Sequence, residues 1–112
     1  MEQVDFSVFQ QLDIRLGTIV SARNFEGAIK PAIQLWIDFG EELGIKKSSA
    51  QLTKRYVPEE LVGKQVLAVV NFKPKQIAHF VSECLVLGVT GNEGDVVLLT
   101  VDKPSPNGLP VS

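Results

Sequence analysis

The segment Ile14-Arg15-Leu16-Gly17-Thr18-Ile19-Val20-Ser21-Ala22-Arg23-Asn24-Phe25 decides the fold class. Apolar and polar residues largely alternate along it, which is the pattern of a β-strand with one face buried. The strand is long, and Gly17 is expected to mark a bend or a bulge within it.

The strand pattern continues beyond this segment. Ala32 to Phe39 predicts a second strand that buries isoleucine and leucine on one face and carries Gln34 and Trp36 on the other. The glycine-rich turn from Gly40 to Gly44 leads into a third strand around Ile45 to Ala50. Three consecutive strands joined by short connections favour antiparallel pairing.

The next part of the chain interrupts the strands. Gln51 to Tyr56 and Pro58 to Val62 suggest short helical pieces, the second with proline at its first position. Gln65 to Phe72 is nearly continuously apolar and predicts a strand with both faces covered. Lys73 to Val81 is expected to be a loop.

A hairpin is expected near the C-terminus, with strands over Glu83 to Thr90 and Asp95 to Val101. Five or six strands without strand–helix alternation indicate a mainly all-β domain. The order fits the five-stranded oligonucleotide/oligosaccharide-binding (OB) barrel, with short helices at the N-terminus and between strands three and four. We expect a single domain over residues 1–112.

The two ends of the chain predict a homodimer interface. Residues 1–12 should contain a short helix capped by Asp5, which carries Phe6 and Phe9, and residues 102–112 form an extended tail with Leu109 and Val111. These apolar residues exceed what a small barrel can cover, and exposed apolar patches commonly mark interfaces. The alternative is that the helix plugs one end of its own barrel.

Charge and composition restrict the possible functions. The 112 residues include 11 Lys+Arg and 13 Asp+Glu, for a formal net charge of −2. This balance argues against nonspecific coating of nucleic acid. A local site remains open, because cations cluster within residues 46–55 and 73–75; the alternative interpretation is ordinary solvated turns.

Catalytic, metal-binding and membrane signals are weak. The chain has one histidine, His79, and one cysteine, Cys84, the latter inside an apolar run that is typical of a buried thiol. No phosphate-binding glycine loop or serine elbow is present. We expect no enzyme activity, no metal and no cofactor. Without a signal-peptide pattern or a long apolar run, a cytoplasmic location without membrane insertion is expected.

Two polar segments follow predicted strands. Ser48-Ser49-Ala50-Gln51 ends the third, while Asn71-Phe72-Lys73-Pro74-Lys75-Gln76-Ile77, followed by Ser82-Glu83, comes after the fourth. Lysine suits phosphate contact, and amide, hydroxyl and carboxylate groups with a flat ring suit an unpaired base. An equally weighted alternative is that Phe72 belongs to the core and the polar groups satisfy loop backbone.

These segments, with Leu12 to Ile19, Lys30-Pro31-Ala32 and Ile37 to Gly40, resemble CsaA. CsaA proteins are secretion-associated chaperones of the tRNA-binding-domain superfamily, which includes the methionyl-tRNA synthetase C-terminal domain and the endothelial-monocyte-activating polypeptide. The resemblance covers nearly the whole chain. It implies an OB barrel, a homodimer, tRNA binding, and binding of unfolded polypeptides or preproteins.

The resemblance also implies a set of binding residues. On this chain they are Lys30, Ser48, Gln51, Lys54, Asn71, Lys73, Lys75, Gln76, Ser82 and Glu83. Two positions depart from the family: Lys73 stands where proline is common, and His79 where glycine is usual. The expected function is a non-catalytic tRNA-binding chaperone in protein export. The alternative is an RNA-binding module without a chaperone role.

Overall fold

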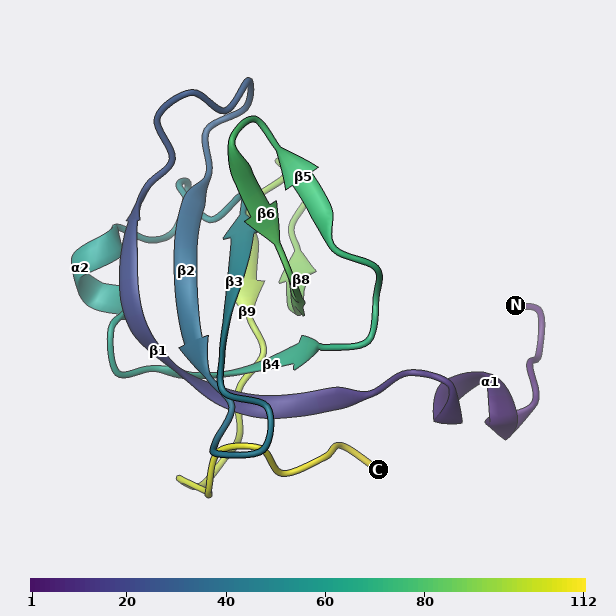
Figure 1. Cartoon of the computed structure of the whole chain (residues 1–112). Coiled ribbons are helices and arrows are strands. Elements are labelled where there is room, and N and C mark those ends of the chain that lie inside the picture. The colour runs from purple at the N-terminus through teal and green to yellow at the C-terminus, as the bar shows by residue number, and fades with distance from the viewer.

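The computed structural model describes residues 1–112 and contains a five-stranded antiparallel sheet curled into a nearly closed barrel (Figure 1). The strands lie in the order β3-β2-β1-β4-β7. Their bounds are β1 Ile14–Asn24, β2 Ile33–Asp38, β3 Ile45–Ala50, β4 Gln65–Val69 and β7 Leu85–Val86. The prediction of an OB-type barrel is confirmed.

Strand β1 is long enough to pair with two neighbours. Its second half pairs with β2 and its first half with β4, and its register against β2 shifts between Ile19 and Ser21. The register shift therefore lies beyond Gly17, so of the predicted bend or bulge, the bulge is not at Gly17. A Cβ atom at Gly17 would lie 2.6 Å from Cγ2 of Ile37, so the glycine is needed for close packing.

The main core fills the barrel. Strand β2 contributes Ile33, Leu35 and Ile37, each with no exposed surface, which confirms the predicted inward face. The short helix α2, Pro58–Leu61, adds Leu61 to this core. Apolar side chains excluded from water in this way supply the main driving force for folding.

Two predicted segments take a different form. Gln51 to Tyr56 is a turn instead of a helix, because Leu52 is anchored in the core and the Tyr56 hydroxyl accepts a 3.1 Å hydrogen bond from the Leu98 amide. Lys73 to Val81 is not a loop. It contains most of a hairpin formed by β5, Lys75–Ile77, and β6, Phe80–Ser82.

The predicted C-terminal hairpin is present but shorter than expected. Strands β8, Gly88–Thr90, and β9, Val96–Leu98, pair antiparallel across the turn. The C-terminal tail then returns to β1, where the Leu16 amide donates to the Leu109 carbonyl at 3.0 Å and the Val111 amide donates to the Ile14 carbonyl at 2.8 Å. The tail is thus fixed along the first half of β1.

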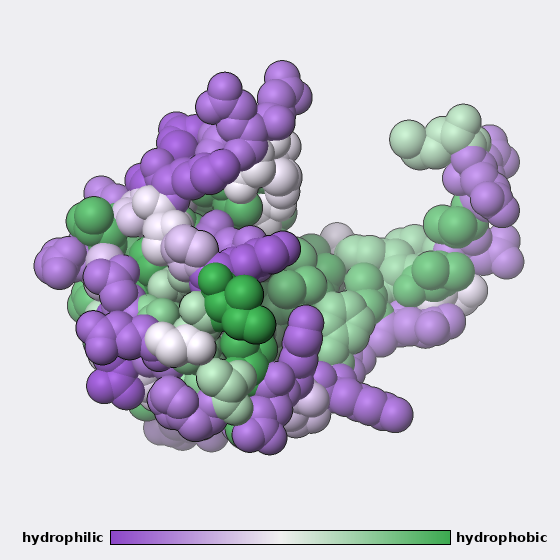
Figure 2. All heavy atoms as spheres, turned by 90° about the horizontal axis from the view of Figure 1, so that it is seen from above, coloured by the Kyte–Doolittle hydropathy of each residue, from purple (hydrophilic) through white to green (hydrophobic).

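Helix α1, Phe6–Gln10, stands away from the barrel on an N-terminal arm (Figure 1). None of its residues is buried, and Phe6 is 68% exposed, so the helix does not plug its own barrel. Figure 2 shows this arm leaving the body, with hydrophobic side chains gathered near its base. None of the helices combines the length and apolar character needed to cross a membrane.

Candidate nucleic-acid interface

A hollow of about 920 Å³, here called the groove, opens between the β1–β2 loop and the β5–β6 hairpin. Its wall continues along the end of β3 and the segment that follows β6. Most of the binding residues predicted from the sequence line it: Lys30, Gln51, Lys73, Lys75, Gln76, Ser82 and Glu83. Segments distant in sequence thus meet around one hollow.

The groove carries three exposed lysines from separate parts of the chain. Lys30 comes from the β1–β2 loop, whereas Lys73 and Lys75 come from the start of the β5–β6 hairpin. None of them forms an ion pair; the two ion pairs of the molecule are Arg15–Asp13 and Arg55–Asp95. Unpaired ammonium groups around one hollow are suited to phosphate oxygens.

Apolar side chains are also exposed in the groove. Phe72 is 47% exposed, so the interpretation that places it in the core is wrong. Ile29 and Leu85 are exposed beside it, at 102% and 49%. The groove therefore offers a flat ring and aliphatic surface next to its lysines.

Ser82 and Glu83 close the seam of the barrel. The Glu83 amide donates to the Lys47 carbonyl at 2.7 Å, and the Glu83 carboxylate accepts from the Lys47 amide at 3.0 Å. The Ser82 hydroxyl accepts from the Ser49 amide at 3.1 Å. These side chains complete the edge of β3 where the backbone ladder is incomplete, and thereby fix one wall of the groove.

Three predicted residues lie outside the groove lining. Ser48 is 1% exposed, and its hydroxyl donates to the Cys84 carbonyl at 2.9 Å. Lys54 donates to the Glu93 carbonyl in the turn before β9. Asn71 holds the base of the N-terminal arm.

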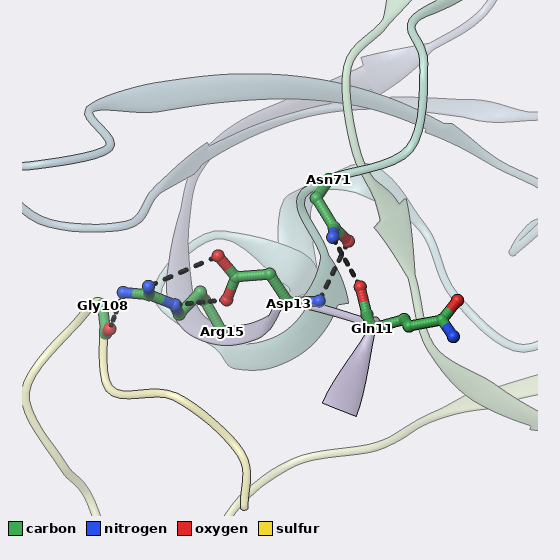
Figure 3. Close-up of polar contacts among 5 residues, drawn as sticks. All are labelled: Gln11, Asp13, Arg15, Asn71 and Gly108. Atoms are coloured by element: carbon green, nitrogen blue, oxygen red, sulfur yellow. Dashed lines mark hydrogen bonds and ion pairs between the residues drawn. The ribbon is translucent and has the colours of Figure 1, made fainter. Parts of the chain in front are cut away.

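The Asn71 amide makes two hydrogen bonds to the arm (Figure 3). Its oxygen accepts from the Asp13 amide at 2.9 Å, and its nitrogen donates to the Gln11 carbonyl at 2.8 Å. Arg15 contacts the Asp13 carboxylate at 2.6 Å and donates to the Gly108 carbonyl at 3.0 Å. Arm, β1 and C-terminal tail are therefore linked at one junction.

A small aromatic cluster, which the sequence patterns did not reveal, joins the two walls of the groove. Phe25 and Ala32 from the ends of the β1–β2 loop pack with Phe80 of β6, and Trp36 lies edge-on to Phe80 with ring centroids 5.8 Å apart. The only signal in the sequence was aromatic residues in otherwise polar surroundings. This cluster holds the loop and the hairpin in a fixed relation.

Cys84 is buried in the core, whereas His79 is exposed in a hairpin turn. Burial raises the pKa of the Cys84 thiol to about 12, although the adjacent Ser48 hydroxyl acts in the opposite direction. His79 lies in the turn of the β5–β6 hairpin, edge-on to Phe25. No three His, Cys, Asp or Glu side chains lie close enough together to hold a metal ion.

Residues 14–110 match the family model described as "Putative tRNA binding domain". The chain belongs to this tRNA-binding domain family. The match spans every strand of the barrel and all the residues that line the groove.

Solved structures agree with this membership. The chain is 54% identical to the chaperone CsaA of Bacillus anthracis, with a TM-score of 0.94 over 99% of this chain and 100% of that one. It is 46% identical to the CsaA chaperone protein of Picrophilus torridus, with a TM-score of 0.90 over 98% and 100% of the two chains. The resemblance to CsaA that the sequence motifs indicated is confirmed.

Curated relatives include much longer proteins. The methionine–tRNA ligase of Methanocaldococcus jannaschii is 37% identical over 103 residues, which are 92% of this chain and 15% of the ligase. The ligase of Methanothrix thermoacetophila is 39% identical over 105 residues, 94% of this chain and 15% of the ligase. The chain spans about 15% of the length of these relatives.

Proposed function

We propose that this protein binds tRNA in the groove without catalysing a reaction, in the cytosol. Lys30, Lys73 and Lys75 would contact backbone phosphates, and Phe72 would lie beneath an unpaired base. The observation that carries the proposal is the meeting of these unpaired lysines around one hollow of a tRNA-binding domain.

The other candidate residues that line the groove are assigned roles according to the hydrogen bonds they already make. Gln51 and Gln76 present amides in the groove and would read the edge of a base. Ser82 and Glu83 would shape the wall and offer their remaining hydrogen-bonding capacity to the same nucleotide.

The three candidates outside the groove receive different roles. Lys54 would contact phosphate at the periphery of a large folded RNA. Ser48 and Asn71 would act as positioning residues, because their polar groups already bind the protein backbone.

A homodimer would present two grooves to one RNA. Phe6 and Phe9 on the arm, with Leu109 and Val111 of the tail, form exposed or half-exposed apolar surface that a second copy would cover. Two linked grooves gain affinity for one folded RNA through effective concentration.

Light scattering at micromolar concentration tests the dimer. The expected result is twice the chain mass, falling to the monomer mass for the variant with Phe6→Ser and Phe9→Ser. A Val20→Ser variant, which removes an exposed apolar residue from the barrel, is the control. A monomeric unmodified protein would contradict this part of the proposal.

A second function, binding of unfolded or exported polypeptides, is favoured by the apolar residues of the groove. Ile29, Phe72 and Leu85 expose aliphatic and aromatic surface to solvent. Both CsaA structures described above are named as chaperones. Apolar surface bordered by polar groups is a common way of holding an extended peptide.

Competition separates the two functions. Labelled total tRNA is bound to the protein at two salt concentrations, with and without an unfolded apolar peptide. tRNA binding should weaken as salt rises, whereas peptide binding should persist. Displacement of tRNA by the peptide would support one shared surface, and absence of peptide binding would leave the RNA-binding function alone.

A further inference from the structure

A second hollow of about 850 Å³ lies on the outer face of β1, β2 and β3. Arg23, Trp36 and Lys47 line it from the three strands, and His79 lines it from the tip of the β5–β6 hairpin. A hollow of this size is large enough for a small ligand or one nucleotide. None of the residues predicted from the sequence to bind RNA belongs to it.

Arg23 is held in a fixed position at this hollow. The guanidinium carbon lies 4.6 Å from the centre of the Trp36 ring. Its Nε donates a 3.0 Å hydrogen bond to the side chain of Gln34, which is only 7% exposed. A buried amide on an outer strand face thus serves to hold an exposed arginine, whose outer side remains open.

Lys47 is a second cation beside the same aromatic cluster. Its ammonium nitrogen lies 5.2 Å from the centre of the Phe80 ring, and Phe80 in turn contacts Trp36. Neither Arg23 nor Lys47 forms an ion pair, although Glu26 and Glu59 also line the hollow. The hollow therefore combines fixed, unpaired cations with carboxylates that can accept hydrogen bonds from the amino groups of a base.

The second hollow adjoins the groove across a single thin wall. In the β5–β6 hairpin, Ile77 and Ala78 line the groove, whereas His79 and Phe80 line the second hollow. The β1–β2 loop divides in the same way, with Glu26 on one side and Gly27 on the other. An RNA strand that left the groove over the tip of the β5–β6 hairpin would therefore enter the second hollow.

We propose that this second hollow holds a nucleotide adjacent to the one in the groove, on the same RNA strand. Its base would stack on the open side of the Arg23 guanidinium, and its phosphate would lie near Lys47. Because it extends the RNA path, this inference rests on the proposed binding of tRNA in the groove.

Trp36 is the only tryptophan in the chain and therefore reports on this hollow directly. The experiment titrates total tRNA into the full-length protein and records tryptophan emission together with binding by filter retention. Emission should change with the same midpoint as filter binding. Arg23→Ala and Lys47→Gln should each weaken binding roughly five-fold or more and reduce the emission change.

Lys103→Ala, which removes an exposed cation outside both hollows, is the matched control and should bind like the unmodified protein. Circular dichroism establishes that each variant is folded. If tRNA binds but Trp36 emission stays constant and both variants bind normally, the second site is excluded while the groove remains. If tRNA does not bind at all, the proposed function fails and this inference with it.

Discussion

Gly17 lies on the buried part of β1, and its missing side chain makes room for Ile37 and Phe39. Gly17→Ala should lower the free energy of unfolding by about 1–3 kcal/mol, because a Cβ atom would lie 2.6 Å from Ile37 and 2.8 Å from Phe39. Urea denaturation measures the change. Ser21→Ala, on the exposed part of the same strand, should change it little, and equal effects would contradict this explanation.

Cys84 should make the stability of the fold vary with pH in the alkaline range. Burial raises its pKa from 9.0 to about 12, so above about pH 9 the unfolded chain loses the thiol proton while the folded chain keeps it. The free energy of unfolding should therefore be unaffected by this group below pH 9 and fall between pH 9 and 12, by at most about 1.4 kcal/mol per pH unit.

The comparison with Cys84→Ala isolates this contribution from lysine and tyrosine titration. The variant should be less stable at neutral pH, because the sulfur atom no longer fills its place in the core, but should show a shallower decline at alkaline pH. Parallel curves for the two proteins would contradict the assignment.

The long β-strands could be predicted from the sequence, whereas the β5–β6 hairpin could not. Alternation identifies β2 because Ile33, Leu35 and Ile37 all face the core. The hairpin turn contains Ala78 with φ of 54°, a backbone conformation that glycine or asparagine normally signals. Because neither glycine nor asparagine is present at this position, the sequence does not predict a turn.

Ala78→Gly should stabilise the hairpin, since glycine adopts a positive φ without the steric cost that alanine meets. The expected gain in the free energy of unfolding is about 0.5–1 kcal/mol. Ala28→Gly is the control, because Ala28 in the β1–β2 loop does not have a positive φ and should gain nothing. Thermal unfolding distinguishes the two outcomes.

The N-terminal arm depends on Asn71 at its base. Asn71→Ala removes both hydrogen bonds to the arm and should speed hydrogen exchange of the Asp13 amide. It should also weaken the proposed dimer by about 1 kcal/mol, because the arm is no longer held in place. Asn92→Ala, an exposed asparagine in another turn, should leave exchange and dimerisation unchanged. An unaltered arm in Asn71→Ala would contradict this role.

The polar segments around the groove could be predicted from the sequence, but the hydrogen bonds of their side chains could not. Lys30 and Lys75 line the same groove because loops of a barrel converge at its end. Ser48 and Asn71 instead bind backbone groups. The backbone group that each polar side chain binds depends on tertiary packing. That pairing cannot be read from a single sequence.

The distribution of charge explains how a protein with a negative net charge can bind an anionic ligand. The formal net charge is −2, yet Lys30, Lys73 and Lys75 surround one hollow without ion pairs. Local cations determine phosphate contact, while the net charge disfavours nonspecific association with nucleic acid. Selectivity for a folded RNA over bulk nucleic acid is the expected result.

The salt dependence of tRNA binding is the sharpest test of whether the groove lysines contact phosphate. The logarithm of the association constant is measured against the logarithm of salt concentration for the unmodified protein and for the variant with Lys30→Ala, Lys73→Ala and Lys75→Ala. We predict weaker binding by the variant and a slope shallower by about 0.7–0.9 for each phosphate that its side chains no longer neutralise. Equal affinities and equal slopes for the two proteins would contradict the assignment of the groove.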